Sequence, residues 1–272
     1  MLGWFSPVIA AMKILLQRLW ECKIDWDESV PQDIRDAWLQ WRSELPSLSN
    51  KSIPRCYSPK GANIVSVQLH GFSDASEDAY AGIVYMCMVD SNRKVHTSLI
   101  MSKTKVAPIK CLSIPRLELC GAHVLAQLLR HAKDVFQLPM NSIFAWTDST
   151  IVLSWLMGNP RRFKTFVGNR VLSIIDQIPP DRWSHVSGIE NPADCASRGL
   201  MPSELMEHKL WWNGPPWLRL ASREWPTQYN VPADRIPEEE REISLVTTVQ
   251  TKQPIIPLDH YSSFSTLQRV TA

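Results

Sequence analysis

Three consecutive segments with β-strand patterning constrain the fold of this 272-residue chain more than any other feature. They read IVSVQLHGFSDAS at 64–76, AYAGIVYMCMV at 79–89 and VHTSLIMSKTKV at 95–106. The connections after the first two, SED and DSNRK, are short and polar. Apolar runs of this length bounded by turn residues are typical of strands. We therefore predict three strands that follow one another directly, joined by tight turns.

Helices and strands alternate in the next part of the chain. We expect helices at 114–136, 149–158, 161–178 and 192–199, and strands at 142–147 and 182–187. Three strands followed by alternating units indicate a mixed sheet with helices on its faces. The predicted fold class is therefore α/β, with the element order βββαβααβα.

The flanking regions have a different character. Residues 8–22 and 30–45 carry apolar groups at helical spacing, and Pro31 suits a helix start. Residues 201–226 are rich in Trp and Pro without periodicity, which predicts an extended flap against the preceding domain. The expected organisation is a remnant of a larger domain at 1–60, the main domain at 64–200, the flap at 201–226, a polar linker at 227–258 and the start of another unit at 259–272.

Composition allows a large core but gives no global sign of a nucleic-acid partner. Apolar residues make up 44% of the chain and the net charge is only +2, so any grip on nucleic acid must be local. The six cysteines form no C-x-x-C pair, and most lie in apolar runs, which predicts reduced core thiols in an intracellular protein. Pro7 and Lys13 interrupt the apolar N-terminus, so we expect neither a membrane span nor a signal peptide.

Four acids stand where an apolar segment meets a turn or a helix start. They are Asp74 in GFSDAS, Glu118 in IPRLELCGA, Asp148 in AWTDST and Asp194 in NPADCASRG. Such positions can bring all four carboxylates to one edge of a sheet, where they would repel one another unless divalent cations neutralised them. Two cations about 4 Å apart are a standard means of cleaving a phosphodiester. The set predicts a metal-dependent nuclease.

Simpler structural roles compete with this interpretation at three of the acids. Asp74 also fits a turn aspartate that accepts local amide hydrogens. Asp148 also fits a helix N-cap, although Ser149 and Thr150 are alternatives. Asp194 follows an Asn-Pro pair and also fits an acid placed at a helix start by the helix dipole.

Glu118 is the most informative of the four. On a helix from residue 114, it shares one face with Gly121, Ala122, Leu125 and Leu129. That face suits packing on a sheet, and the two small residues permit a close approach. A carboxylate at the head of a buried face is costly unless it is paired or bound to metal. A solvated first-turn acid fits this phase poorly.

Seven motifs, in order and spacing, resemble the ribonuclease H region of the polyproteins of BEL/Pao-type LTR retrotransposons. They are FSDAS, SKTKVAPIK, IPRLELCGA, WTDSTIVLSWL, FKTFVGNRV, WSHVSGIENPADCASRGL and LWWNGPPWL. FSPVIAAMKILLQRLWECKIDWDE resembles the stretch that follows the polymerase thumb, and YSSFSTLQRVTA resembles the segment that leads toward the integrase. The resemblance implies partners in the reverse transcriptase and integrase portions of the same polyprotein.

The resemblance also implies a fold, a cofactor and a reaction. The fold is ribonuclease H-like: a five-stranded mixed sheet, its first three strands antiparallel, flanked by helices. Asp74, Glu118, Asp148 and Asp194 would bind two Mg²⁺ ions, replaceable by Mn²⁺, and hydrolyse the RNA strand of an RNA–DNA hybrid during reverse transcription. Asp74 would bridge both ions, Glu118 and Asp148 would complete one site, and Asp194 the other. Family context implies cytoplasmic virus-like particles, with the nucleus as the alternative.

One motif departs from cellular ribonucleases H. Those enzymes carry a histidine in a glycine-containing loop after the last strand, whereas the loop here reads SGIEN. His185 lies on the strand before it and also fits a partly buried strand residue. The departure implies slower proton transfer or product release, with metal binding retained.

Residues that could hold the hybrid surround the predicted site. A hybrid is gripped through its backbone and the 2′-hydroxyls of its minor groove, and such binding weakens with salt. The candidates are Ser76, Lys103, Lys105, Ser149, Asn169 and Arg170, with Lys110, Arg161, Arg162 and Lys164 as further cations. Any one of these cations also fits a solvated basic surface.

Three other interpretations remain open. A catalytically idle or host-adopted element could keep the fold as a nucleic-acid- or protein-binding module. An integrase-like DNA transferase shares the fold, but its glutamate comes late, whereas here the glutamate comes second and a fourth acid follows. The tryptophans of WWNGPPW could form a docking surface, although clustered tryptophans more often cover a core.

Overall fold

A computed structural model describes residues 2–58, 61–226 and 239–240. The chain divides into two units, Met1–Glu240 and Arg241–Ala272, and the account below concerns the first. The predicted unit at 259–272 lies outside the described residues, as does the predicted linker except for Glu239 and Glu240.

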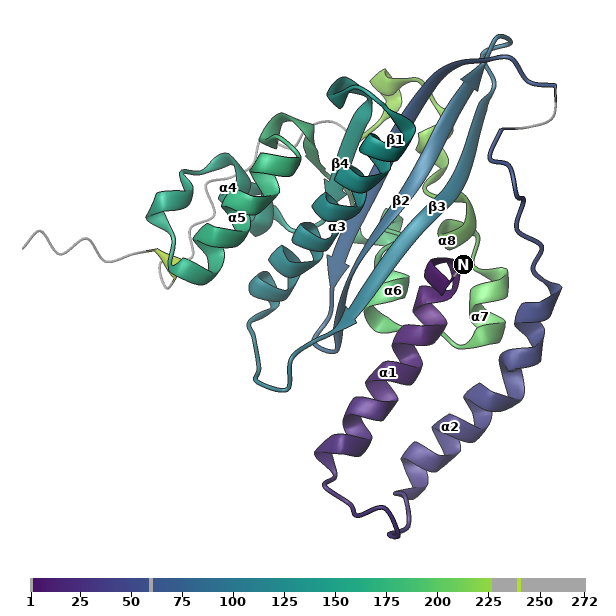
Figure 1. Ribbon diagram of the computed structural model, residues 1–272, viewed down its shortest axis with the longest axis vertical. Coiled ribbons are helices and arrows are strands. Elements are labelled where there is room, and N and C mark those ends of the chain that lie inside the picture. The colour runs from purple at the N-terminus through teal and green to yellow at the C-terminus, as the bar shows by residue number, and fades with distance from the viewer. Residues whose placement is uncertain (1, 59–60, 227–238, 241–272) are drawn as a thin grey trace, which may run out of the picture. The chain divides into compact units, whose positions relative to one another are not determined.

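A five-stranded mixed sheet forms the centre of the fold (Figure 1). Its strands are β1 (Ile64–Ala75), β2 (Ala79–Asp90), β3 (Val95–Val106), β4 (Ile143–Thr147) and β5 (Trp183–His185). The order across the sheet is β3-β2-β1-β4-β5. The first three strands pair antiparallel, while β4 pairs parallel with both β1 and β5. This is the ribonuclease H-like sheet that the resemblance implied, so the predicted fold class is confirmed.

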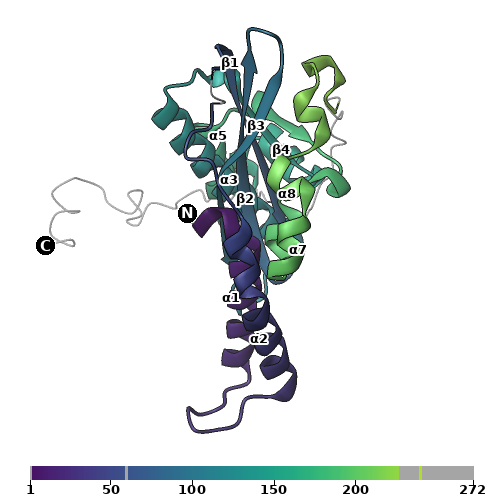
Figure 2. The same ribbon diagram turned by 90° about the vertical axis from the view of Figure 1, so that its right-hand side faces the viewer.

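Helices lie on both faces of the sheet, as Figures 1 and 2 show. Their bounds are α1 Ser6–Glu21, α2 Gln32–Glu44, α3 Ile114–Phe136, α4 Thr150–Met157, α5 Thr165–Gln177, α6 Asp194–Arg198, α7 Pro202–Glu207 and α8 Lys209–Asn213. The strand β2 is buried on both sides: Val84 and Met86 face the α3 core, whereas Ile83 and Tyr85 face the opposite core. An uninterrupted apolar run is the pattern expected of such a strand.

The helix α3 lies unusually close to the sheet because glycines stand at the contact. A Cβ atom added to Gly121 would lie 2.8 Å from the carbonyl oxygen of Asp74. A Cβ atom on Gly82 would lie 2.9 Å from the Cα atom of Leu125. The face predicted from Gly121 and Leu125 is therefore the face that packs. This contact fixes the start of α3 beside the end of β1.

The region predicted as an extended flap covers the opposite face and is largely helical. It forms α7 and α8 and two short 3-10 turns, so the prediction of extended backbone was wrong. Trp211 and Trp217 are buried in the second core. The Trp211 indole donates to the carbonyl of Trp4 at 2.9 Å, and the Tyr85 hydroxyl donates to the Trp211 carbonyl at 2.6 Å. These tryptophans cover the sheet, which is the commoner role foreseen for them.

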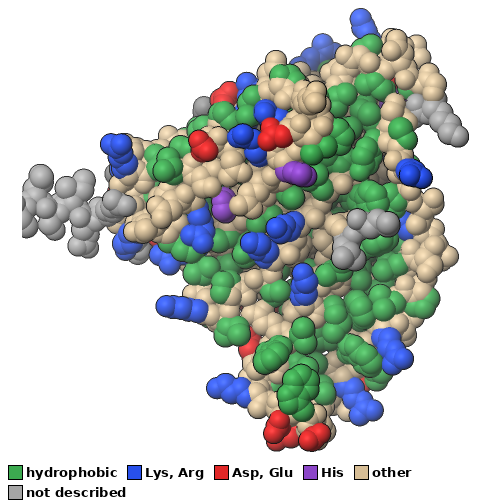
Figure 3. All heavy atoms as spheres, viewed as in Figure 1, with side chains coloured by type: hydrophobic (Ala, Val, Ile, Leu, Met, Phe, Trp, Pro, Cys, Tyr) green, Lys and Arg blue, Asp and Glu red, His purple; other side chains and the backbone are tan. Residues whose placement is uncertain are grey.

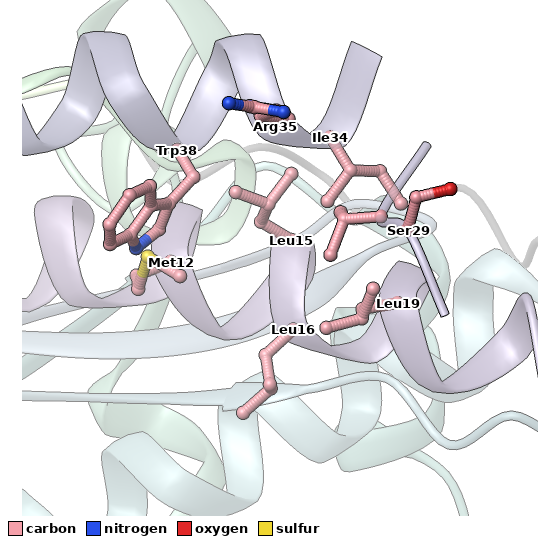
Figure 4. Close-up of a pocket in the computed structure, with 9 residues that line it drawn as sticks. Met12, Leu15, Leu16, Leu19, Ser29, Ile34, Arg35 and Trp38 are labelled. Carbon is pink, nitrogen blue, oxygen red and sulfur yellow. The ribbon is translucent and has the colours of Figure 1, made fainter. Parts of the chain in front are cut away.

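The first two helices form a hairpin with an apolar groove between them (Figure 4). The groove has a volume of about 480 Å³, and its lining includes Leu15, Leu16, Leu19, Ile34 and Trp38. The start of α1 packs against α6 and β3, while α2 contacts α1 and α7. Both predicted helices exist, and they lean on each other and on the domain.

The cysteines agree only in part with the prediction of reduced core thiols. All six cysteines are free, but Cys22, Cys56 and Cys111 are exposed, so the expectation that most lie in the core was wrong. These three belong to loops and a helix end, where a short apolar run does not guarantee burial.

The prediction that the chain has no membrane span agrees with the described residues, because none of their helices combines the length and the apolar character that a span requires.

Candidate active site

Two of the four predicted acids reach the same end of the sheet because of strand direction. β1 and β4 run parallel, with Ser73 opposite Thr147. Asp74 is the next residue of β1, and Asp148 directly follows β4. Parallel strands bring the residues at their carboxyl ends to one edge, which is where α/β folds place ligands. The sheet therefore brings Asp74 and Asp148 together.

Helices bring the other two acids to this edge. Glu118 lies in α3, whose Gly121 touches the Asp74 backbone. Asp194 is the first residue of α6, and Ser197 of the same helix donates a hydrogen bond to the Asp74 carboxylate. The four acids thus come from two strands and two helices, as the sequence predicted.

The carboxylates of the four acids interact electrostatically, and these interactions contribute to the raised pKa values of Asp74, Glu118 and Asp148. Burial and the neighbouring Asp148 and Asp194 raise the pKa of Asp74 to about 7, against the lowering effect of its Ser197 hydrogen bond. Burial, with repulsion from Asp148, also raises the pKa of Glu118 to about 7. Burial raises the pKa of Asp148, and repulsion from Asp194 adds to it. Perturbed acids gathered in this way are typical of functional sites.

The simpler role considered for Asp148 belongs to its neighbour Ser149, whereas Asp74 shares its simpler role with Ser76. Ser149 caps α4 by accepting a hydrogen bond from the Val152 amide at 3.2 Å, so Asp148 is not the N-cap. The Ser76 hydroxyl accepts hydrogen bonds from the amides of Asp78 and Ala79 in the β1–β2 turn. The Asp74 carboxylate also accepts one local amide hydrogen, from the backbone of Ala75, which lowers its pKa. At Asp194 the helix-start role holds as well, because this acid is the first residue of α6. Arg198 of the same helix donates to its carboxylate at 2.5 Å.

Hydroxyl groups hold two of the carboxylates in place. Ser149 donates to Glu118 at 2.5 Å, and Ser197 donates to Asp74. Ser149 and Ser76 were predicted to donate to phosphate oxygens, but a hydroxyl has a single hydrogen. Ser76 uses that hydrogen on the carbonyl of Ser197 at 2.6 Å. Both serines therefore work inside the protein as positioning residues.

A buried asparagine, which the sequence did not single out as a site residue, ties the acidic edge together. The Asn191 side chain donates to the carbonyl of Ser73 at 2.9 Å and accepts from the amide of Ala193 at 3.1 Å. It also hydrogen-bonds Asp148, which lowers the pKa of that acid. Asn191 thus links the end of β1, the residue after β4 and the entry to α6. The only sequence signal was its place in NPAD, three residues before Asp194.

His185 stands near the acids, at the end of β5. It is half-buried, as expected of a strand histidine, and its charge lowers the pKa of Asp148. The loop that follows places Gly188 beside the same acid, since a Cβ atom there would lie 3.3 Å from Oδ2 of Asp148. The loop itself has no histidine, but His185 on the preceding strand interacts with the same acid.

The donor set suits a hard divalent cation, with one reservation from geometry. Carboxylate oxygens are the ligands that Mg²⁺ prefers, and Oδ1 of Asp148 is buried without a hydrogen-bond partner in the part of the chain that the structure describes. Within residues 2–58, 61–226 and 239–240, however, no three His, Cys, Asp or Glu side chains are arranged so that they could hold a metal. Asp74, Glu118 and Asp194 instead contact Ser197, Ser149 and Arg198. A metal would require these side chains to turn.

Several of the predicted cations lie on the α3 side of the sheet. Figure 3 shows Lys and Arg side chains gathered over α3 and the adjoining strands. Lys103 and Lys105 are exposed on the edge strand β3, and Asn169 is exposed on α5. Lys105 and Arg170 both lower the pKa of Cys120, although burial raises it more. Lys105 and Arg170 therefore approach one position of α3, two residues after Glu118.

This sheet, with acids from its parallel strands and from the first helix after the hairpin strands, defines a protein of the ribonuclease H-like class. A family model described as the Pao retrotransposon-like RNaseH-like domain matches residues 1–149, more than half of the chain. The chain belongs to this family. The match includes Asp74, Glu118 and Asp148 and ends before Asp194.

Solved structures with a similar fold are ribonucleases H. The N-terminal RNase H domain of Rv2228c from Mycobacterium tuberculosis, solved as a fusion with maltose-binding protein, is 14% identical over 48% of this chain and 94% of that chain, with a TM-score of 0.33. RNase H1 from the archaeon Halobacterium salinarum is 14% identical over 52% and 96%, with a TM-score of 0.31. LC11-RNase H1, in complex with RNA/DNA hybrid, is 10% identical over 47% and 91%, with a TM-score of 0.32. No curated protein matches the chain.

Proposed function

We propose that this protein is a metal-dependent endonuclease that hydrolyses the RNA strand of RNA–DNA hybrids during retrotransposon reverse transcription. The observation that carries the proposal is the electrostatic coupling of the acids at one sheet edge: Asp148 and Asp194 raise the pKa of Asp74, and Asp148 raises the pKa of Glu118. A protein gains nothing in stability from such repulsion. A divalent cation would remove it and would make the same residues a catalytic centre.

The four acids would hold Mg²⁺, with Mn²⁺ as a substitute. Bound ions would supply an activated water and charge stabilisation of the leaving 3′ oxygen. Ser149 and Ser197 orient Glu118 and Asp74 by their hydrogen bonds. Asn191 holds Asp148 against the end of β1. His185, which already interacts electrostatically with Asp148, is the nearest candidate among the described residues to replace the missing loop histidine in proton transfer.

Basic and polar side chains beside the acids would hold the hybrid. Lys103, Lys105, Asn169 and Arg170 are the predicted contacts, and they lie on β3 and α5, both of which contact α3. Contacts of this kind read the backbone and the shape of a hybrid, not its sequence. Reverse transcriptase and integrase portions of the same polyprotein are the expected partners.

Cleavage of a labelled RNA–DNA hybrid tests the proposal. The full chain is assayed in Mg²⁺, in Mn²⁺ and in chelator, beside Asp148→Asn and the matched surface variant Asp181→Asn. We expect cleavage of the RNA strand alone, a loss of at least about 100-fold in Asp148→Asn, and wild-type rates in Asp181→Asn, since one positioned catalytic group contributes on that scale.

The competing function is a catalytically idle binding module. A folded protein that binds the hybrid in every metal, but leaves both strands intact, would overturn the nuclease and support that module. Cleavage that survives Asp148→Asn would instead point to a contaminating activity.

A further inference from the structure

Two acidic residues near the end of the described chain bind to the basic side of the proposed site. Glu239 and Glu240 lie 121 and 122 positions after Glu118 in the sequence, yet they contact α3 and the segment just before α5. In Figure 1 this short segment is the yellow piece beside α5. No feature of the sequence predicted the contact, because the segment reads as a polar linker.

The Glu239 carboxylate makes a bidentate contact with the guanidinium group of Arg116. Arg116 donates from Nε at 2.6 Å and from Nη2 at 3.0 Å to the two carboxylate oxygens of Glu239. Glu239 is buried, with a side chain 7% exposed. The planar guanidinium makes the same two-pronged contact with carboxylates and with phosphates. Arg116 therefore presents a geometry that suits a nucleic-acid phosphate.

Backbone pairing fixes the segment over a second cation. Phe163 pairs antiparallel with Glu240, and the amide of Lys164 donates to the carbonyl of Glu239 at 2.7 Å. Arg162 donates to the Glu240 carboxylate at 3.2 Å. The two glutamates thus neutralise Arg116 and Arg162, one at the start of α3 and one just before α5.

The neutralised arginines continue the basic surface that would hold the hybrid. The ring of Phe166 lies between two guanidinium groups, with Arg170 at 3.6 Å and Arg116 at 5.1 Å from its centroid. Arg170 and Lys105 in turn approach Cys120. Arg116 is also only two residues before Glu118. Arg116, Arg170 and Lys105 are therefore linked by their contacts with Phe166 and Cys120 along one side of α3.

We propose that Arg116 and Arg162 form a binding site for the backbone phosphates of the hybrid, and that Glu239 and Glu240 occupy this site as an internal competitor. The inference rests on the proposed function, because the hybrid is the ligand. Binding of the hybrid would have to displace the two glutamates, so the chain holds itself in a state of reduced affinity. Competition of this kind is a coupling between two ligands of one site.

Hybrid binding by the full chain in chelator tests the competition without cleavage. Fluorescence anisotropy with a labelled hybrid compares the wild type, E239Q/E240Q and the control E207Q/E224Q, which makes the same charge change at two exposed positions. We expect about tenfold tighter binding by E239Q/E240Q, within the usual range of such couplings, and less than a twofold change in the control. The gain should disappear when R116Q is added, because the freed cation is then absent.

Each outcome supports or overturns the competition. Equal affinities of the wild type and E239Q/E240Q, or no binding by either, would overturn it. A lower melting temperature of E239Q/E240Q with unchanged affinity would overturn it too, and would show that the contact only stabilises the folded protein. A gain as large in E207Q/E224Q would reduce the effect to net charge. Tighter binding without any cleavage in Mg²⁺ would leave the competition standing and contradict the nuclease alone.

Discussion

At the scale of single residues, the raised pKa of Asp74 makes stability depend on pH. Its pKa rises from 3.8 to about 7 on folding, chiefly through burial and then through repulsion from Asp148. Between these values the folded state binds the proton more tightly than the unfolded state. Stability from this group is therefore greatest below about pH 4 and falls as pH rises toward 7. His70, fully buried with its pKa lowered to about 3, works in the opposite direction below pH 6.5.

The variant Asp74→Asn separates the pH dependence of stability due to Asp74 from that due to His70. The variant has no charge to bury at any pH, so in chelator its free energy of unfolding should exceed that of the wild type by about 3 kcal/mol more at pH 8 than at pH 4.5. Urea unfolding at the two pH values measures the difference. His70 is common to both proteins and cancels. A difference between variant and wild type that is the same at both pH values would contradict the buried, repelled carboxylate.

The sequence indicated that the four acids lie at one sheet edge but gave no sign of the residues that hold them there. Asp74, Glu118, Asp148 and Asp194 each follow or begin an apolar element, and that local signal is visible in the chain. Asn191 and Ser197 act through contacts across more than 100 positions. No local pattern encodes such a contact. Ser76 and Ser149 were predicted to contact phosphate oxygens, and in the structure they donate to the Ser197 carbonyl and the Glu118 carboxylate. The sequence did not indicate these partners, because a serine hydroxyl suits a phosphate and a protein oxygen equally well.

At the scale of elements, Gly121 sets the distance between α3 and the sheet. A methyl group there would stand 2.8 Å from the Asp74 carbonyl oxygen, a contact that requires the helix or the strand to move. Gly121→Ala should therefore lower the free energy of unfolding by about 2 kcal/mol, despite the better helix propensity of alanine.

The exposed Gln127 of the same helix provides the control. Gln127→Ala should change the free energy of unfolding by less than about 0.5 kcal/mol. Because the displaced helix carries Glu118, Gly121→Ala should also slow hybrid cleavage, whereas Gln127→Ala should not. A Gly121→Ala protein that is as stable as Gln127→Ala would show that the close approach of α3 and β1 is not needed.

The helices α7 and α8 complete the second core, and tryptophan substitutions measure their contribution. Trp211 is fully buried and donates to the Trp4 carbonyl, so Trp211→Ala should cost about 4 kcal/mol. Trp26 is 93% exposed and serves as the matched control. Trp26→Ala should stay within about 0.5 kcal/mol of the wild type in chemical denaturation. Equal losses would mean that α8 does not pack on the sheet.

Element prediction succeeded where the sequence showed a periodic pattern and failed where it showed none. The bounds predicted for α3 and β3 agree with the structure, since 12 or more periodic residues define each. Residues 202–213 lack a period, and Pro and Gly suggested extended chain. Their short helices are held by tertiary contacts, such as the Trp212 indole with the Leu205 carbonyl at 2.7 Å. Propensity is a weak guide when packing decides.

At the scale of the molecule, the net charge of +2 conceals a separation of charge that should make stability depend on divalent cations. The acids repel one another at one sheet edge, so a cation bound there would stabilise the folded state by mass action. At about 100 times its dissociation constant, the gain is about 2.7 kcal/mol. For a domain of this size, that corresponds to a melting temperature higher by about 5–10 °C.

Thermal unfolding in Mg²⁺, against NaCl of equal ionic strength, measures this effect without reference to activity. We expect the Mg²⁺-dependent rise at pH 8 and a smaller one at pH 5, where protons compete for Asp74 and Glu118. Asp74→Asn combined with Asp148→Asn should abolish the rise, because neither repulsion nor ligands remain. A rise that is the same in NaCl would be general screening. A rise retained in the double variant would mean that the cation binds elsewhere. Either result would contradict a metal site at the acidic edge and would say nothing against the fold.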